Sequence, residues 1–279
     1  MIKIILAGMF GSIMVYLFAT APAPLPDRSV TAIDDCQFEV QSLFDGVNAI
    51  NDAARSIYTK RVVGGGKLAG LAFGEDWQEP TVEKGPLPAL FLRLTAARLE
   101  TKPPPLGLYL GSDAPINKSN LFTPEQLVSF EEVKTKRTPV FLLSAVAGNV
   151  GMYPDVAGVA PCVDCHNDHE DSPKTDWKLG DVMGATTWTY PDKTLNLNSY
   201  FSALEATFVS VQEAYQLYLD KTTGFELPVG VGENWPKEGR RTLPDADVFL
   251  AEVRAAAAAQ LVEAMLPVDG LGDVGKCAS

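Results

Sequence analysis

The chain has 279 residues, of which 46% are hydrophobic, and a formal net charge of −12 at pH 7. This hydrophobic content supports a packed core and excludes a disordered chain, while the acidic balance opposes binding to nucleic acid or to an anionic membrane surface. The four cysteines are too few for a disulfide scaffold. We therefore expect one sizeable domain, or one domain with an appendage.

The N-terminal segment predicts export from the cytoplasm. Lys3 and the amino terminus precede an uncharged apolar run from Ile4 to Ala21, and a proline-rich break follows. The run is near the lower length limit for a helix that crosses a bilayer. Each possible cleavage site is followed by proline, which signal peptidases handle badly, so we favour residues 2–21 as a retained membrane anchor. A cleaved signal, leaving a soluble protein on the periplasmic or equivalent exported side, is the alternative.

The first part of the exported chain predicts two helices separated by a loop. Apolar residues from Cys36 to Ile57, at alternating spacings of four and three, predict a long helix over residues 33–62 with Cys36 on its apolar face. Glycine, proline and charged residues predict a loop over 64–86. Pro88 then opens a short amphipathic helix over 88–99.

The rest of the chain mixes strands and helices. Thr123 as N-cap, Pro124 at the first helical position and Gln126 closing a capping box predict a helix that ends near residue 134. Later helices are expected over 195–220 and 246–266. Strands are expected over 105–112, 138–148, 149–153 and 180–191, with a Gly- and Pro-rich loop over 152–161. Few, mostly antiparallel strands with helices between them predict an α+β domain with its helices on one face of a small sheet.

The stretch CVDCHNDH, residues 162–169, contains both histidines of the chain and two of its four cysteines. At this composition, Cys-x-x-Cys-His is expected by chance roughly 0.0004 times per chain. Accident is therefore a poor explanation, and some chemistry must need these side chains together.

Two of the three chemistries that use such residues fit this spacing badly. A zinc site would have to take Cys162, Cys165, His166 and His169 from eight consecutive residues, whereas structural zinc sites draw two ligand pairs from separate parts of a chain. A thioredoxin-like dithiol needs the cysteines at a helix N-terminus after a strand, and the preceding stretch predicts a loop.

Covalent haem explains every position of the motif. Two thiols three residues apart can reach the two vinyl groups of one porphyrin, and the imidazole of the next residue can bind the iron from below. We therefore assign one haem c to Cys162, Cys165 and His166. Haem c is attached outside the cytoplasm, which agrees with the N-terminal segment.

The motif also carries a family resemblance. CVDCHNDHEDSPKTDWKLGDVMG, residues 162–184, resembles the signature of the PAS-like single-haem c family, which occurs as exported cytochromes and as sensory ectodomains of histidine kinases and chemoreceptors. SIYTKRVV, GPLPALFLR, APINKSNLF and FEEV are similar to the family's other blocks, in the same order. The resemblance covers about 31–192, which divides the chain into anchor and linker (1–30), haem domain (31–192) and helical C-terminal extension (193–279).

The resemblance implies a PAS-like antiparallel sheet with flanking helices around one haem, and His166 as the proximal ligand. In some members a cysteine from the N-terminal helix is the distal ligand, and Cys36 is the residue that matches it. Met183, Met152 or an open position are alternatives, and Cys36 could instead be a small buried residue or a disulfide partner of Cys277. His169 is too close to His166 to reach the opposite face of the ring.

Several cationic or N–H-bearing side chains are candidates for binding the haem propionates. Lys174, Trp177 and Lys178 follow the motif and could hydrogen-bond these carboxylates. Among residues distant from the motif, the sequence does not choose between Arg55, Lys60 and Arg93.

Two roles remain open for such a protein, and neither is enzymatic. The first is sensing of redox state or of a small gas through a signalling partner, because no output module follows residue 192. The second is electron transfer as a cytochrome subunit of a membrane complex, with the C-terminal helices either docking to that complex or simply capping the haem domain. A peroxidase-type enzyme ranks third, since no distal histidine or arginine can be placed.

Overall fold

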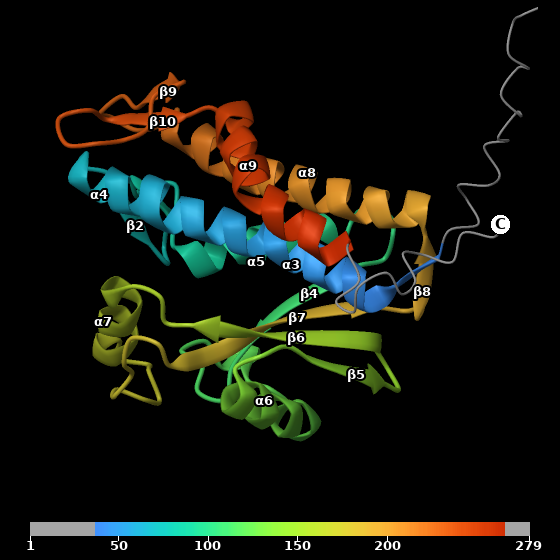
Figure 1. The fold of residues 1–279 in the computed structure, drawn as a ribbon. Helices are drawn as coiled ribbons and strands as arrows, with labels where there is room; N and C mark the ends of the chain where they lie inside the picture. The colour runs from blue at the N-terminus through green and yellow to red at the C-terminus, as the bar shows by residue number, and fades with distance from the viewer. Residues whose placement is uncertain (1–36, 266–279) are drawn as a thin grey trace, which may run out of the picture.

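A computed structural model describes residues 37–265 of the chain. The predictions for the anchor at 2–21, for Cys36 and for Cys277 fall outside these residues. The described chain forms a helical layer packed against a four-stranded sheet, with one helix on the opposite face of the sheet and one short helix at its end (Figure 1). It is an α+β fold.

The helical layer is built from segments distant in sequence. It contains α3 (Val40–Ile57), the π-helix η1 (Tyr58–Gly64), α4 (Gly65–Leu68), α5 (Pro88–Leu99), α8 (Leu197–Thr222) and α9 (Ala246–Met265). The other helices are the 3₁₀ turn η2 (Lys118–Asn120), α6 (Pro124–Lys136) and α7 (Ala160–Asp168). None of the helices between residues 37 and 265 is both long and apolar enough to cross a membrane.

The main sheet is antiparallel throughout, with strand order β4-β7-β6-β5. Its strands are β4 (Gly107–Gly111), β5 (Val140–Ser144), β6 (Gly148–Val156) and β7 (Val182–Tyr190). Three small pairs lie beside it: β1 (Gln37–Glu39) with β8 (Thr194–Asn196), β2 (Ala72–Gly74) with β3 (Lys84–Pro86), and β9 (Gly230–Gly232) with β10 (Thr242–Pro244).

The sheet has helices on both faces, so the expectation of helices on one face is wrong. Alternate residues of a strand point to opposite faces. Tyr153 and Trp188 face the helical layer and join the main core with α3, α5, α8 and α9. Met152 faces α6 and packs in a smaller core with Phe122 and Phe130. The helices predicted as a C-terminal extension thus share one core with α3.

Several predicted elements are confirmed. The helix at 88–99 is α5, and the strands at 105–112 and 180–191 contain β4 and β7. The capping box opens α6, because Thr123 N–H donates to Gln126 Oε1 at 2.9 Å and Gln126 N–H donates to Thr123 Oγ1 at 3.3 Å. The two C-terminal helices lie within two residues of the expected bounds.

Other boundaries differ. Residues 37–39 form β1 rather than helix, because they pair with β8, and α3 begins only at Val40. The expected loop over 64–86 contains α4, β2 and β3. The first of the two paired strands is expected to run to Gly148, but β5 ends at Ser144, residues 145–147 form the turn, and Gly148, with φ of +73°, already belongs to β6.

Candidate functional site

The Cys-x-x-Cys-His motif lies on α7, at one end of the molecule (Figure 1). Residues three and four apart share one face of a helix, so Cys162, Cys165 and His166 project from the same side of α7. Cys162 and His166 are half-buried, Cys165 is exposed, and neither thiol forms a disulfide within residues 37–265. One flat group could therefore contact all three side chains.

The prediction of a loop over residues 152–161 is largely wrong, and the difference bears on the thioredoxin-like alternative. β6 continues to Val156, and α7 starts at Ala160, so the motif does begin a helix after a strand. A reactive dithiol would also need a lowered thiol pKa. Burial and the nearby Asp155 carboxylate instead raise the pKa of Cys162. The thiol is not activated as a redox nucleophile.

Polar contacts align α3 over the sheet. Tyr153 donates to Asp45 Oδ1 at 2.6 Å, and the Trp188 indole donates to Asn48 Oδ1 at 3.1 Å. Asp45, Asn48 and Arg55 recur at helical spacing, so they share the face of α3 that looks at β6 and β7. These contacts fix the register that brings Arg55 to the end of the sheet, beside α7.

Arg55 is held there by two side chains, Asp155 and Thr186. Its guanidinium forms an ion pair with Asp155 at the end of β6 and donates to Thr186 Oγ1 of β7 at 3.0 Å. Its side chain is only 22% exposed. Burial disfavours the charge, but Asp155 and Asp52 outweigh it and raise the pKa of Arg55, whose charge also interacts with Cys162. Of the three cations that the sequence could not rank, the structure brings Arg55 to the motif; Lys60 and Arg93 are exposed.

Three buried N–H or ring-nitrogen atoms in this region have no hydrogen-bond partner among residues 37–265: Arg55 Nε, His166 Nδ1 and Trp177 Nε1. Buried polar atoms are normally paired, because leaving one unpaired costs about 1–3 kcal/mol. Burial also lowers the pKa of His166, so its imidazole is neutral at pH 7, which is the form that binds metals.

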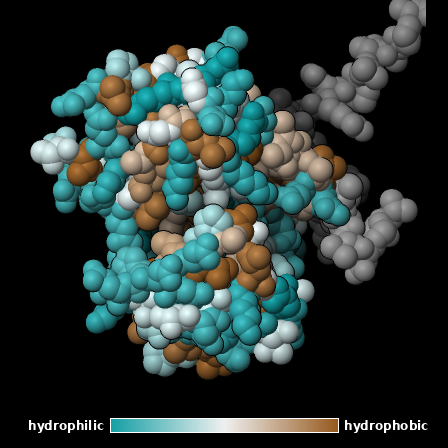
Figure 2. Space-filling view, turned by 90° about the vertical axis from the view of Figure 1, so that its left-hand side faces the viewer, coloured by the Kyte–Doolittle hydropathy of each residue, from teal (hydrophilic) through white to brown (hydrophobic). Residues whose placement is uncertain are grey.

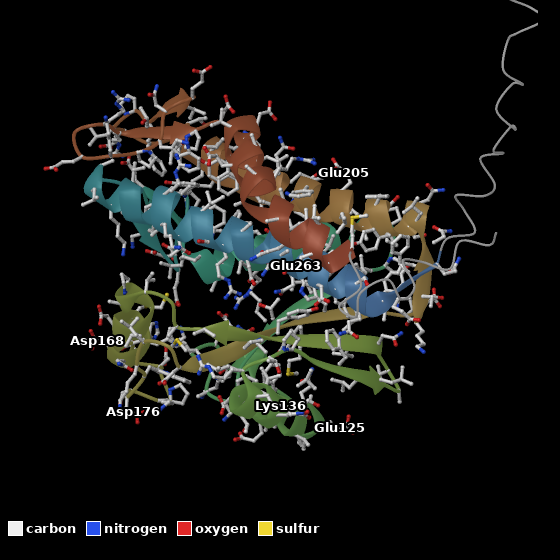
Figure 3. All side chains as sticks on the ribbon, viewed as in Figure 1. Glu125, Lys136, Asp168, Asp176, Glu205 and Glu263 are labelled. Atoms are coloured by element: carbon white, nitrogen blue, oxygen red, sulfur yellow. The ribbon has the colours of Figure 1, made fainter. Side chains whose placement is uncertain are left out.

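The segment after α7 folds back against it through Asn167. The Asn167 side chain donates to Trp177 O at 3.0 Å and accepts from Trp177 N–H at 2.8 Å. Lys174 lies over the Trp177 ring, 4.7 Å from its centre, and forms an ion pair with Asp176. Figure 3 shows Asp168 and Asp176 on the outer side of this region, away from α3. Of the three residues predicted to bind propionates, Trp177 has a buried N–H with no partner in the described part of the chain, Lys174 is paired with Asp176, and Lys178 is exposed.

The same end of the molecule carries exposed apolar side chains. Leu68 of α4 is 69% exposed, Val156 of β6 40% and Leu179 61%. In Figure 2, which views this end, apolar side chains gather at mid-height between the helical layer and the region below it. His169, at the end of α7, lies close to the turn after β2, since its Nε2 is 3.7 Å from Glu75 Oε1.

The candidate distal ligands lie in different places. Met152 is 1% exposed and lies on the α6 face of the sheet, opposite Arg55. Met183 is half-buried at the bulge between β6 and β7. Cys36 is outside the described residues, so its role stays a prediction. Its neighbour Gln37 pairs with Asn196, and the fifteen residue steps along the helix from Val40 to Arg55 correspond to roughly 22 Å.

Sequence reasoning missed Asp155 and Thr186. Asp155 lies seven residues before Cys162, which was a usable signal, but its partner is a hundred residues away on α3. Thr186 is one of several threonines in a strand. Asp155 and Thr186 can be recognised as partners of Arg55 only once β6 is known to pair with β7 beneath α3.

The comparison with protein families identifies the region that contains this site. Residues 66–191 match the Tll0287-like family model. This family is known as a c-type cytochrome-like domain. The Tll0287-like region, just under half of the chain, extends from α4 to the end of β7 and includes α7 and Trp177, but not Arg55. No curated protein and no solved structure matches the chain.

Proposed function

We propose that the protein is an exported c-type cytochrome with one haem, bound covalently through Cys162 and Cys165 and ligated by His166. The observation that carries the proposal is the shared face of α7 on which these three side chains lie, together with the neutral His166. The match of residues 66–191 to a cytochrome-like family supports it.

The surrounding residues fit a haem. Arg55 Nε and Trp177 Nε1 are buried donors without partners in the part of the chain that the structure describes, and carboxylates such as the two propionates would satisfy them. Exposed Leu68, Val156 and Leu179 offer apolar surface for the porphyrin ring. The attachment chemistry needs no oxidant, because each thiol adds its sulfur and its hydrogen across one vinyl double bond and no atom leaves.

For the biological role, we favour sensing of redox state or a small gas through a signalling partner, on a PAS-like fold. Support comes from the resemblance of the motif and from the antiparallel sheet flanked by helices on both faces. We place the protein on the periplasmic or equivalent side of a membrane, anchored by residues 2–21, because of the apolar run from Ile4 to Ala21.

Electron transfer as a subunit of a membrane complex is the second candidate, and one observation favours it. Cys165 is exposed, so a haem attached there would have one edge at the protein surface, within reach of a redox partner. A sensor that relies on gas access to the iron does not need this exposure.

The first experiment tests haem attachment. The full chain would be produced in a bacterial periplasm that contains a haem c maturation system, as wild type, as the Cys162→Ala/Cys165→Ala double variant and as the Cys277→Ala control. We expect haem to stay with wild type and Cys277→Ala after acidic acetone extraction. The doubly substituted Cys162→Ala/Cys165→Ala chain should lose it. Haem that is extracted from the wild type would refute the proposal.

The second experiment separates the two roles. Optical and electron paramagnetic resonance spectra would be compared for the wild type, Cys36→Ser and Met183→Leu in both oxidation states. A thiolate-type ferric signal lost only in Cys36→Ser, or an open site that binds carbon monoxide, favours sensing. A six-coordinate iron that changes only in Met183→Leu favours electron transfer.

A further inference from the structure

The hairpin formed by β5 and β6 is exposed and unusually apolar. Between Arg137 and Asp155 the sequence contains no charged residue, in a chain of which 21% is charged. Leu143 is 77% exposed, and Val146 at the tip is 98% exposed. Exposed apolar groups are common singly, but a continuous uncharged hairpin that projects them together marks an interaction surface.

The fold shows why this surface is left uncovered. Within residues 37–265, β5 is an edge strand that pairs only with β6. Val140 packs into the core beneath α6, whereas Phe141 packs edge-on against Tyr153, on the α3 face of the sheet. Leu143, two residues further along the strand, points to the same face but is not covered by α3.

The hairpin lies at the end of the molecule where the described chain begins. Its base is joined to β7, since the Asn149 side chain donates to Tyr190 O and Pro191 O. β8 follows immediately and pairs with β1, and Val40 N–H donates to Lys193 O at 2.9 Å. In Figure 1, β8 and the turn of the β5–β6 hairpin are at the same end, opposite α7.

We propose that the β5–β6 hairpin docks on the bilayer, inserting Leu143 and Val146 into the interfacial region of neutral phospholipids. This inference rests on the proposed membrane anchor at residues 2–21, which is followed by only fifteen residues before Gln37. The tether thus keeps this end of the molecule close to the lipid surface. The absence of charge suits neutral lipid, because a chain with a net charge of −12 is repelled by anionic membranes.

Docking would give the protein a fixed orientation. The motif on α7 lies at the opposite end of the sheet from the hairpin (Figure 1). A haem on α7 would therefore face away from the membrane, toward a partner in the aqueous compartment or a protruding part of a membrane complex.

The test uses the full haem-loaded chain in phosphatidylcholine vesicles doped with a phosphatidylcholine that carries a diazirine on the upper part of one acyl chain. After illumination, lipid adducts are located by mass spectrometry. We expect adducts in residues 2–21 and also in residues 140–149. Leu143→Glu/Val146→Glu should lower the hairpin adducts about tenfold, without affecting those in 2–21. Both side chains are exposed, so this variant keeps the fold.

The matched control is Leu227→Glu/Val231→Glu, which changes two exposed apolar residues far from the hairpin in sequence. It should leave all adducts unchanged. Adducts in 2–21 without any in 140–149 would overturn the docking while leaving the anchor intact. Adducts in neither region would overturn the anchor and the docking together, whatever the state of the haem.

Discussion

Arg55 and Asp155, a hundred residues apart in sequence, form an ion pair where α3 crosses the end of β6. The pair lies beside the motif, because the charge of Arg55 interacts with Cys162 and that of Asp155 with His166. If His166 ligates the proposed haem, a charge at this place would act on the iron through that ligand and tune its reduction potential.

We therefore expect Asp155→Asn to raise the reduction potential of the proposed haem. Removal of a negative charge near His166 disfavours the ferric state, with a shift on the order of 50 mV. Asp176→Asn, on the outer side of the region, is the control and should shift the potential far less (Figure 3). Spectroelectrochemical titration measures both. Equal potentials in wild type and Asp155→Asn would place the iron elsewhere.

A second prediction concerns the buried contact between α3 and β7. Asn48→Ala removes the acceptor of the fully buried Trp188 indole N–H, so it should lower the free energy of unfolding by about 1–3 kcal/mol. Gln41→Ala, at an exposed position of the same helix, should change it by less than about 0.5 kcal/mol. Urea unfolding of the two variants checks this. If Asn48→Ala lowered the free energy of unfolding as little as Gln41→Ala, the Trp188–Asn48 hydrogen bond would not contribute to stability.

The capping box gives a third prediction. Thr123→Ala leaves the Gln126 N–H without its partner and should cost about 1 kcal/mol. Thr135→Ala, near the end of the same helix, removes only an exposed hydroxyl that bonds to Glu131 O. Its effect should be near zero or slightly stabilising, because alanine is the better helix former. Thermal unfolding monitored by circular dichroism distinguishes the two.

A fourth prediction concerns the pH dependence of stability. Burial raises the pKa of Asp45 above its usual 3.8, even though the hydrogen bond from Tyr153 opposes this. The folded state therefore holds the proton more tightly than the unfolded state, and wild type loses stability as pH rises from below 3.8 through the raised folded value. Asp45→Asn lacks this loss. Urea unfolding should show wild type falling relative to the variant over that range, with a constant difference above it. If the wild type instead gained stability relative to Asp45→Asn as the pH rose through this range, the folded state would stabilise the anionic form of Asp45.

The sequence predicts elements whose signals are local. α6 has its capping box within four residues, α5 has proline at its first position, and the buried side of α3 repeats at helical spacing. The motif is likewise local, so Cys162, Cys165 and His166 could be chosen without a structure. The composition of residues 138–154 already shows the uncharged hairpin, but not that its tip is exposed.

Features that depend on distant pairing could not be predicted. β1 interrupts the expected helix because it pairs with β8, more than 150 residues away. Arg55 could not be separated from Lys60 and Arg93 until Asp155 and Thr186 were placed beside it. The loop expected over 152–161 is reduced to residues 157–159, because β7 extends the pairing of β6 to Val156 and α7 begins at Ala160.

The most direct measurement of the central claim is the mass of the tryptic peptide of residues 138–174, which contains Cys162 and Cys165 but neither of the other cysteines. For protein matured in a periplasm with haem c attachment, we predict the mass of the unmodified peptide plus one complete haem, because addition to the vinyl groups loses no atoms. The unmodified mass, or a mass lower by the two hydrogens of a Cys162–Cys165 disulfide, would contradict the account.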